Sequence, residues 1–122
     1  MKDTFKAVYW EKEEKAMSDN LSIADLKNEE WREVKNFNNY KISNYGRLKK
    51  INKDGSEKIC KQQSTEKGYK FCKLEAICKK HKVRIHLLVA EAFFNIITDN
   101  FEIKHKNGIV WDNRVDNLKY IE

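Results

Sequence analysis

The segment that most constrains the fold is a run of nine residues, HLLVAEAFF, from His86 to Phe94. It is the clearest helical pattern in the chain, because Leu88, Val89 and Ala92 recur along one face. Most of its residues are apolar, so other parts of the chain must cover it. We therefore expect a central core helix over residues 86–94, with His86 as a structural hydrogen-bonding residue at its start.

The segments on either side of this helix alternate apolar and polar residues, as short strands do. Residues 68–74 show this alternation before the helix, and residues 101–105 and 118–121 read as two short strands after it. The pair Asp54-Gly55 predicts a hairpin turn, since these residues tolerate the positive φ that such turns require. The pattern predicts an α+β fold with a small β-rich module, a central helix and a C-terminal ββ hairpin.

Charge is distributed unevenly along the 122 residues. Residues 1–30 carry a net charge of −3, whereas residues 47–84 hold 13 basic and 4 acidic side chains. A basic block of this density is typical of a surface for a polyanion, because lysines and arginines near phosphates release condensed counterions. The alternative is the solvated face of a lysine-rich protein. Aromatic residues interleaved with the charge, at Tyr45, Tyr69 and Phe71, favour nucleic acid.

Several classes of protein fit the sequence poorly. No apolar run approaches the ~18 residues that a membrane helix needs, and no signal-peptide pattern opens the chain. Three cysteines are an odd number for a secreted disulfide framework. Cys60, Cys72, Cys78 and His81 are spaced unlike any familiar zinc site. We expect a soluble, cytoplasmic protein with no membrane partner.

Two stretches resemble one family of proteins. The stretch EEWREVKNFNNYKISNYGRLKK, residues 29–50, resembles the nuclease-associated modular DNA-binding (NUMOD) motif of phage and intron-encoded endonucleases. From Gly68 onward the chain is similar to HNH homing endonucleases: IHLLVAEAFF resembles the helix before their catalytic hairpin, and IKHKNGIVWDNRVDNLKYI resembles the hairpin. The positions shared with the NUMOD motif are Trp31, Phe37, Tyr40, Ser43, Asn44, Gly46 and Arg47.

The resemblance implies a site of two short antiparallel strands and a helix that hold one divalent metal. His105 matches the general-base position, and Asn113 and Asn117 match the loop asparagines. Lys104 stands where the family places an Asp or Asn metal ligand, and a cation cannot ligate Mg²⁺. The sequence stops at Glu122, before the helix that carries the other ligand. We therefore expect an HNH-like ββ hairpin that lacks its final metal-binding helix, and Mg²⁺ or another divalent metal only if the nuclease is active.

Three segments follow from the resemblance. They are an acidic N-terminal leader at 1–28, a NUMOD-like DNA-binding motif at 29–52, and an HNH-like domain at 53–122 that is truncated at its C-terminus. The residues expected to contact nucleic acid are basic or lie in the turn of the motif: Ser43, Asn44, Arg47, Lys49, Lys50, Lys70, Lys73 and Arg84.

The function favoured by these observations is that of a DNA-binding relative of phage-type HNH endonucleases, with an incomplete and inactive nuclease centre, acting as a regulator or counter-defence inhibitor. One alternative is an active metal-dependent nicking endonuclease, with ligands from Asp112, Asp116 or a second chain. Another is an inhibitor that binds a host or defence-system protein through its acidic leader. Double-stranded DNA is the first expected partner. Apolar hairpin residues would need cover from a homodimer or from the leader: Ile103, Val115, Leu118 and Ile121.

Overall fold

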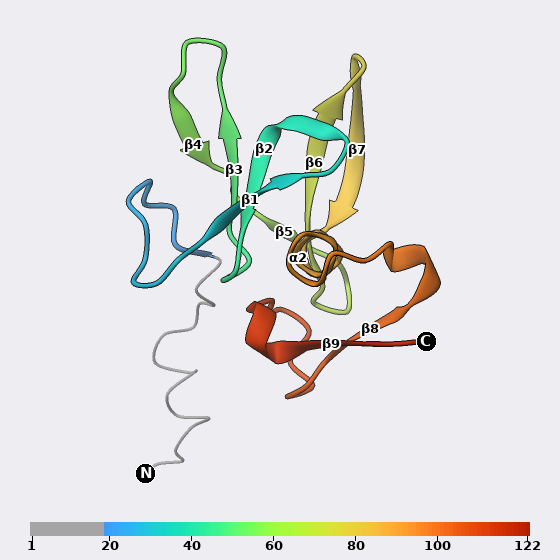
Figure 1. The fold of residues 1–122 in the computed structure, drawn as a ribbon. Helices are drawn as coiled ribbons and strands as arrows, with labels where there is room; N and C mark the ends of the chain where they lie inside the picture. Colours follow the sequence, from blue (N-terminus) through green and yellow to red (C-terminus); the bar gives the residue numbers. More distant parts are fainter. Residues whose placement is uncertain (1–18) are drawn as a thin grey trace.

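The computed structural model describes residues 19–122, and Figure 1 shows their arrangement. The first part of the chain is a four-stranded antiparallel meander in the order β1-β2-β3-β4. Its strands are β1 (Trp31–Val34), β2 (Phe37–Ser43), β3 (Leu48–Ile51) and β4 (Glu57–Ile59). The turn between β3 and β4 contains Asp54 and Gly55, as predicted, and Gly55 has a φ of 88°.

A three-stranded antiparallel sheet follows in the order β5-β6-β7. Its strands are β5 (Gln63–Ser64), β6 (Lys70–Ala76) and β7 (Lys79–Arg84). The β3–β4 and β6–β7 hairpins project in the same direction, away from the C-terminal part of the chain (Figure 1). An ion pair of 3.2 Å between Lys50 Nζ and Glu75 Oε1 joins them.

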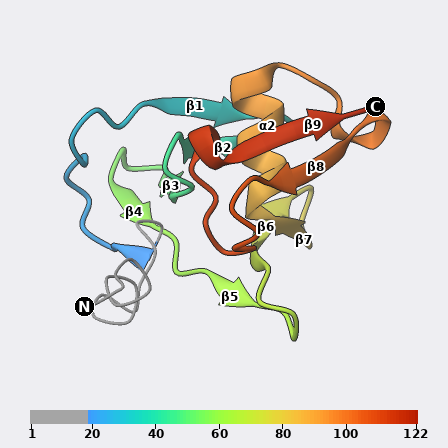
Figure 2. The same ribbon diagram turned by 90° about the horizontal axis from the view of Figure 1, so that it is seen from below.

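The helix predicted over residues 86–94 is confirmed as α2 (Ile85–Phe94), which begins one residue earlier. It ends where Asn95 takes a left-handed conformation with a φ of 56°. The last elements are η2 (Thr98–Asn100), β8 (Glu102–His105), η3 (Val115–Asn117) and β9 (Leu118–Ile121). β8 and β9 form the predicted antiparallel hairpin, which lies beside α2 in both Figure 1 and Figure 2.

The hydrophobic core lies around α2, between the sheets and the β8–β9 hairpin. Its most deeply buried side chains come from all these parts of the chain: Ile42, Leu48, Leu74, Ile85, Val89 and Leu118. The domain is therefore small, β-rich and built on one α-helix among the residues described. None of its helices in residues 19–122 has the length and apolar character to cross a membrane.

The hairpin is better covered than the sequence suggested. Leu118 is only 2% exposed, and Ile103 and Val115 pack against the core beside α2. Of the four residues expected to need cover, Ile121 is the one that stays well exposed, at 40%. The predicted leader, residues 1–28, lies for the most part outside the described residues, so its proposed role as a cover is not addressed by the structure.

Candidate nucleic-acid interface and HNH-like centre

His105 is the last residue of β8, where it pairs with Leu118 of β9. Its Nε2 lies 2.7 Å from Oδ1 of Asn113. Because an amide oxygen only accepts hydrogen bonds, Nε2 of His105 is the donor in this contact, and Nδ1 is not used in it. Asn113 itself is 1% exposed, and its buried Nδ2 has no hydrogen-bond partner among the described residues.

Two further rings lie against His105. The ring centres of His86 and Tyr69 are 5.2 Å and 6.1 Å from that of His105, and 5.5 Å from each other. We call Tyr69, His86 and His105 the ring cluster. The guanidinium carbon of Arg84 lies 4.9 Å from the centre of the Tyr69 ring, so the end of β7 also reaches this cluster.

His86 is held neutral at physiological pH by its surroundings. Burial is the main cause, and repulsion from His105 and Arg84 adds to it; together they lower the pKa of His86 to about 4. Its Nδ1 is buried and has no partner among the described residues. His86 was expected to be a structural hydrogen-bonding residue. Its Nδ1 does not have this role, because no described residue offers it a donor or an acceptor.

Asn117 joins the two ends of the loop between β8 and β9. Its Nδ2 donates to the carbonyl of Asp112 (2.8 Å) and to Oδ1 of Asn107 (2.9 Å), and its Oδ1 accepts from the backbone N–H of Asn107 (3.1 Å). The carboxylate of Asp112 accepts two hydrogen bonds from Arg114, at 2.8 and 2.7 Å. Burial would raise the pKa of Asp112, but the hydrogen bonds and charge of Arg114 outweigh it and keep that pKa below its usual value.

These residues do not supply the donor set that a Mg²⁺ ion requires, which is a shell of oxygen ligands. The oxygens of Asp112 are occupied by Arg114 and Asn107, and the side-chain oxygen of Asn113 is occupied by His105. Lys104 is paired instead with Glu102, at 3.8 Å. Within residues 19–122 no three His, Cys, Asp or Glu side chains gather as a metal site would need.

The arginine of the NUMOD-like turn is buried, contrary to its predicted contact with phosphate. The side chain of Arg47 is 0% exposed, and it forms a two-fold hydrogen bond with Glu29 at 2.9 and 2.6 Å. Its other donors reach the carbonyls of Asn20, Ser22 and Ala24 at 2.6 to 3.0 Å. All five N–H groups are thus used inside the protein. We call this arrangement the Arg47 clamp; it attaches residues 20–29 to the β-sheet.

The other residues of the turn also have structural contacts. The hydroxyl of Ser43 accepts from the backbone N–H groups of Tyr45 and Arg47, both at 3.1 Å. Oδ1 of Asn44 accepts a hydrogen bond from the backbone N–H of Glu30 (2.8 Å), and the backbone carbonyl of Asn44 accepts one from the N–H of Val115 (2.8 Å). The turn therefore links the first strands to the loop of the β8–β9 hairpin.

Gly46 completes this link at a point where a side chain would not fit. Its φ is +84°, and a Cβ at this position would lie 3.0 Å from the Cβ of Asn113. Glycine is required there both by the backbone conformation and by the close approach of the Asn113 loop.

The predicted basic contacts divide into buried and exposed groups. Lys49 is largely buried, with its Nζ 3.2 Å from Glu57 and 4.4 Å from the ring centre of Trp31, and Lys70 is 3.4 Å from Asp19. Lys50, Lys73 and Arg84 have more exposed side chains.

The register of β6 and β7 reveals a basic surface that the sequence did not. Lys73 pairs with Lys82, Glu75 with Lys80, and Phe71 with Arg84, so these six side chains share one face. We call its four cations, Lys73, Lys80, Lys82 and Arg84, the basic face. Lys80 and Lys82 were missed as contacts because their alternation is visible only once the turn between the strands is placed.

A groove runs beside the basic face, between β6 and the β3–β4 hairpin. Its volume is about 370 Å³, and Glu75 is its one acidic residue. Five lysines line it: Lys50, Lys58, Lys61, Lys73 and Lys80. We call it the lysine groove. Its charge is complementary to a polyanion.

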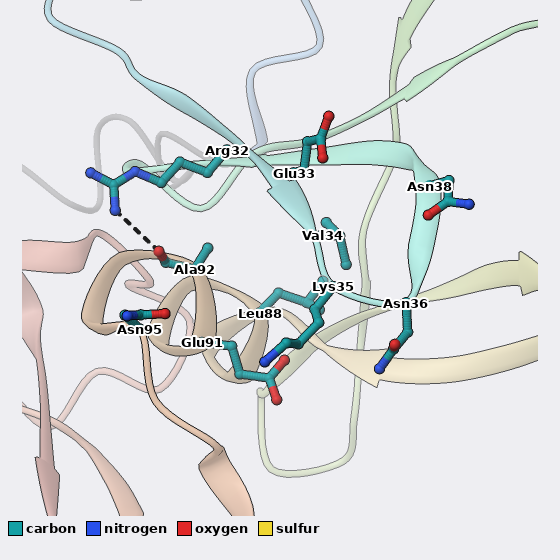
Figure 3. Close-up of a pocket in the computed structure, with 10 residues that line it drawn as sticks. All are labelled: Arg32, Glu33, Val34, Lys35, Asn36, Asn38, Leu88, Glu91, Ala92 and Asn95. Atoms are coloured by element: carbon teal, nitrogen blue, oxygen red, sulfur yellow. Dashed lines mark hydrogen bonds between the residues drawn. The ribbon is translucent and has the colours of Figure 1, made fainter.

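A second pocket, of about 390 Å³, lies between the β1–β2 hairpin and the C-terminal part of α2 (Figure 3). Arg32 crosses from β1 to donate to the carbonyl of Ala92 at 3.1 Å, and so caps a helix end that has no basic residue of its own. The pocket carries Glu33 and Glu91 as well as Lys35. This mixed charge distinguishes it from the lysine groove.

Comparisons with known proteins point to the family that the sequence resembles. Residues 29–75 match the NUMOD4 motif. Two uncharacterized HNH endonucleases of Acanthamoeba polyphaga mimivirus are similar: one is 36% identical over 90 residues, the other 38% identical over 101 residues. Three-quarters of the chain is thus similar to HNH endonucleases, and its first part carries a NUMOD4 motif. The structure of the HNH homing endonuclease I-HmuI, described for its binding and cleavage of DNA, matches with a TM-score of 0.67 and 30% identity.

The matches cover most of this chain but a smaller share of each similar protein. The alignments cover 74% and 78% of this chain but 26% and 24% of the mimivirus proteins, and 75% of this chain but 52% of I-HmuI. The NUMOD4 match begins at residue 29, where the motif was predicted to begin, and continues to residue 75, well past residue 52. It therefore includes β1 to β5 and most of β6, with part of the lysine groove.

Proposed function

We propose that this chain binds double-stranded DNA through the basic face and the lysine groove, and that it does not cleave DNA by itself. The observation that carries the proposal is the lysine groove, where five lysines surround one glutamate that is already paired with Lys50. A regulator or a counter-defence inhibitor would need this binding without cleavage.

The arrangement of the basic face supports a path for a DNA backbone. A two-stranded ribbon such as β6–β7 fits the major groove of duplex DNA. The face continues from Lys82, whose Nζ lies 4.4 Å from the ring centre of Phe71, to Arg84 above Tyr69. Tyr69 belongs to the ring cluster, so a phosphate backbone that follows the basic face leads to His105.

The test is a salt titration of binding to a random-sequence duplex. Replacing Lys73 and Lys80 together by Gln should weaken binding and reduce the slope of log K against log[salt] by about 2, because each phosphate contact contributes about 0.9. Lys27→Gln with Lys35→Gln is the matched control, since it removes the same charge from exposed residues outside the groove. Equal slopes in both double variants, or no binding at low salt, would reject the proposal.

Cleavage is tested separately, because His105 has a free Nδ1 that could act as a base if other residues supplied a metal. Supercoiled plasmid with Mg²⁺ or Mn²⁺ should stay intact with stoichiometric protein. Nicking that is lost in His105→Ala would instead favour the alternative of an active nicking endonuclease. In that enzyme Asp112 could bind metal only after leaving Arg114.

A protein partner, from the host or a defence system, is the remaining alternative. It rests on the acidic charge of residues 1–30. Deleting residues 1–18, which hold four basic and four acidic side chains, would leave the Arg47 clamp in place. Because this deletion removes no net charge, a rise in DNA affinity would indicate that these residues cover the basic face, and unchanged affinity would leave residues 19–30 as the acidic contact.

A further inference from the structure

The tip of the β6–β7 hairpin has an unfavourable sequence for its conformation. Two residues, Ile77 and Cys78, connect the strands, and both have positive φ, 52° and 60°. Hairpin turns with positive φ at both central residues strongly prefer Asn-Gly. A β-branched residue in this region is a genuine outlier, because its side chain crowds the backbone.

The same isoleucine is also the most exposed large apolar residue that the structure describes. Ile77 is 92% exposed, compared with 57% for Ile97 and 40% for Ile121. Nothing in the fold compensates for placing it there, since the tip projects away from α2 and the β8–β9 hairpin (Figure 1). Ile77 therefore combines a strained backbone with an almost fully exposed apolar side chain. This combination indicates that Ile77 contacts another molecule.

The surroundings of the tip indicate which partner it contacts. Lys79 follows the turn directly, and Lys80, Lys82 and Lys73 line the ribbon behind it. An apolar tip on a cationic ribbon is poorly suited to an apolar protein pocket, because its lysines would lose hydration there without gaining partners. It is complementary to duplex DNA, where phosphates flank the groove and the apolar faces of the bases lie between the stacked base pairs.

We propose that Ile77 is a wedge that enters duplex DNA between base pairs when the basic face binds. This inference rests on the proposed DNA binding. Isoleucine is among the side chains that separate stacked bases, and the cost of unstacking is offset by the added contacts that a deformed duplex makes with the protein. The left-handed turn serves this role because it holds the side chain away from the ribbon.

The critical variant is Ile77→Asn with Cys78→Gly, which installs the preferred turn and removes the wedge. Relaxed plasmid is resealed by a topoisomerase in the presence of saturating protein, and the linking number is then measured. The wild-type chain should lower the linking number, because separating base pairs unwinds the helix. The double variant should not lower it, and its affinity should fall by a few-fold.

Two controls separate the wedge from other effects of the substitution. Cys78→Gly alone keeps Ile77 at the tip and should unwind DNA like the wild type. Ile97→Asn removes an exposed isoleucine elsewhere and should also leave unwinding unchanged. The double variant should unfold at a higher urea concentration than the wild type, since the strained turn is relieved. A double variant that fails to fold contradicts the strain on which the inference is based.

The outcomes distinguish the wedge from DNA binding itself. Salt-dependent binding by the wild type with an unchanged linking number overturns the wedge and leaves the proposed function standing. Equal unwinding by the double variant also overturns it. If the wild type does not bind DNA at all, the proposed function fails. The exposed Ile77 would then be expected to contact a protein partner.

Discussion

Two polar clusters, which are connected where Gly46 approaches Asn113, are built in opposite ways. In the Arg47 clamp every donor of the guanidinium has a partner, and both side chains of the Arg47–Glu29 pair are 0% exposed. Around the ring cluster, Nδ1 of His86 and Nδ2 of Asn113 are buried with no partner among the described residues. Most buried polar atoms in proteins are satisfied, so such exceptions call for an explanation.

The difference separates polar groups that hold the fold from buried polar groups that have no partner among the described residues. An unsatisfied buried polar atom costs about 1–3 kcal/mol, and a small domain has little stability to spare. The clamp avoids that cost by using all its hydrogen bonds internally. The groups around the ring cluster carry that cost, at the end of the basic face.

Breaking the clamp should have the largest effect on stability. Arg47→Met leaves the carboxylate of Glu29 buried without its partner, and the free energy of unfolding should fall by about 3–5 kcal/mol. Urea unfolding measures this loss, and Arg47→Met combined with Glu29→Leu should recover part of it. A loss below about 1 kcal/mol would show that the clamp is not structural.

His86 of the ring cluster should make the free energy of unfolding depend on pH. The pKa of His86 is about 4 in the folded chain and 6.5 in the reference state. Its neutral form therefore stabilises the fold fully above about pH 6.5, and this contribution, up to about 3 kcal/mol, is lost as the pH falls towards 4. Urea unfolding at pH 7.0 and 4.5 should show a smaller difference for His86→Leu than for the wild type. Equal differences would mean that His86 is not held neutral.

The contrast between the clusters also explains what could be predicted from sequence. The helix at 86–94 and the strands at 101–105 and 118–121 follow from local periodicity, and the structure has all three within one residue at each end. The burial of Arg47 could not be predicted in this way, because its partners lie 18 to 27 residues earlier in the chain. Arginine beside a turn suggests phosphate binding unless the carboxylate that neutralises it is known.

The turn at the tip of the β6–β7 hairpin was not predicted from the sequence for a related reason. Turn prediction relies on Asn, Asp and Gly, and the sequence Ile-Cys has none of them. Without the turn, the register that aligns Lys73 with Lys82 was not available. His105 and its two asparagines were predicted from the family resemblance, but the neighbouring His86 was assigned a role without knowledge of its unpartnered nitrogen.

The connection between the two clusters can be tested at Gly46. In Gly46→Ala the new Cβ meets Asn113 at 3.0 Å, and the residue must also hold a φ of +84°. We expect a loss of about 2 kcal/mol in the free energy of unfolding. Gly55→Ala is the matched control, since its φ is +88° but nothing lies within 4 Å of the new Cβ. The excess loss at Gly46 measures the contact; equal losses would indicate backbone strain alone.

The smallest expected effect is at Asn113, and it addresses the comparison most directly. Asn113→Ala keeps the Cβ that packs against Gly46 and removes both the oxygen bound by His105 and the unpartnered Nδ2. The loss of one hydrogen bond is offset by the removal of a buried, unsatisfied donor. The half-buried His105 can form a hydrogen bond with water instead. The free energy of unfolding should therefore fall by less than about 1 kcal/mol.

Asn117→Ala is the matched comparison, because this buried amide makes three hydrogen bonds in the same loop. Its loss should cost about 2–3 kcal/mol, measured by urea unfolding at pH 7. If Asn113→Ala were as costly as Asn117→Ala, its amide would have to be satisfied in solution, and the ring cluster would be as closed as the Arg47 clamp. If it is nearly neutral, Asn113 is retained for a reason other than stability, and the same variant should then alter the binding of DNA near His105.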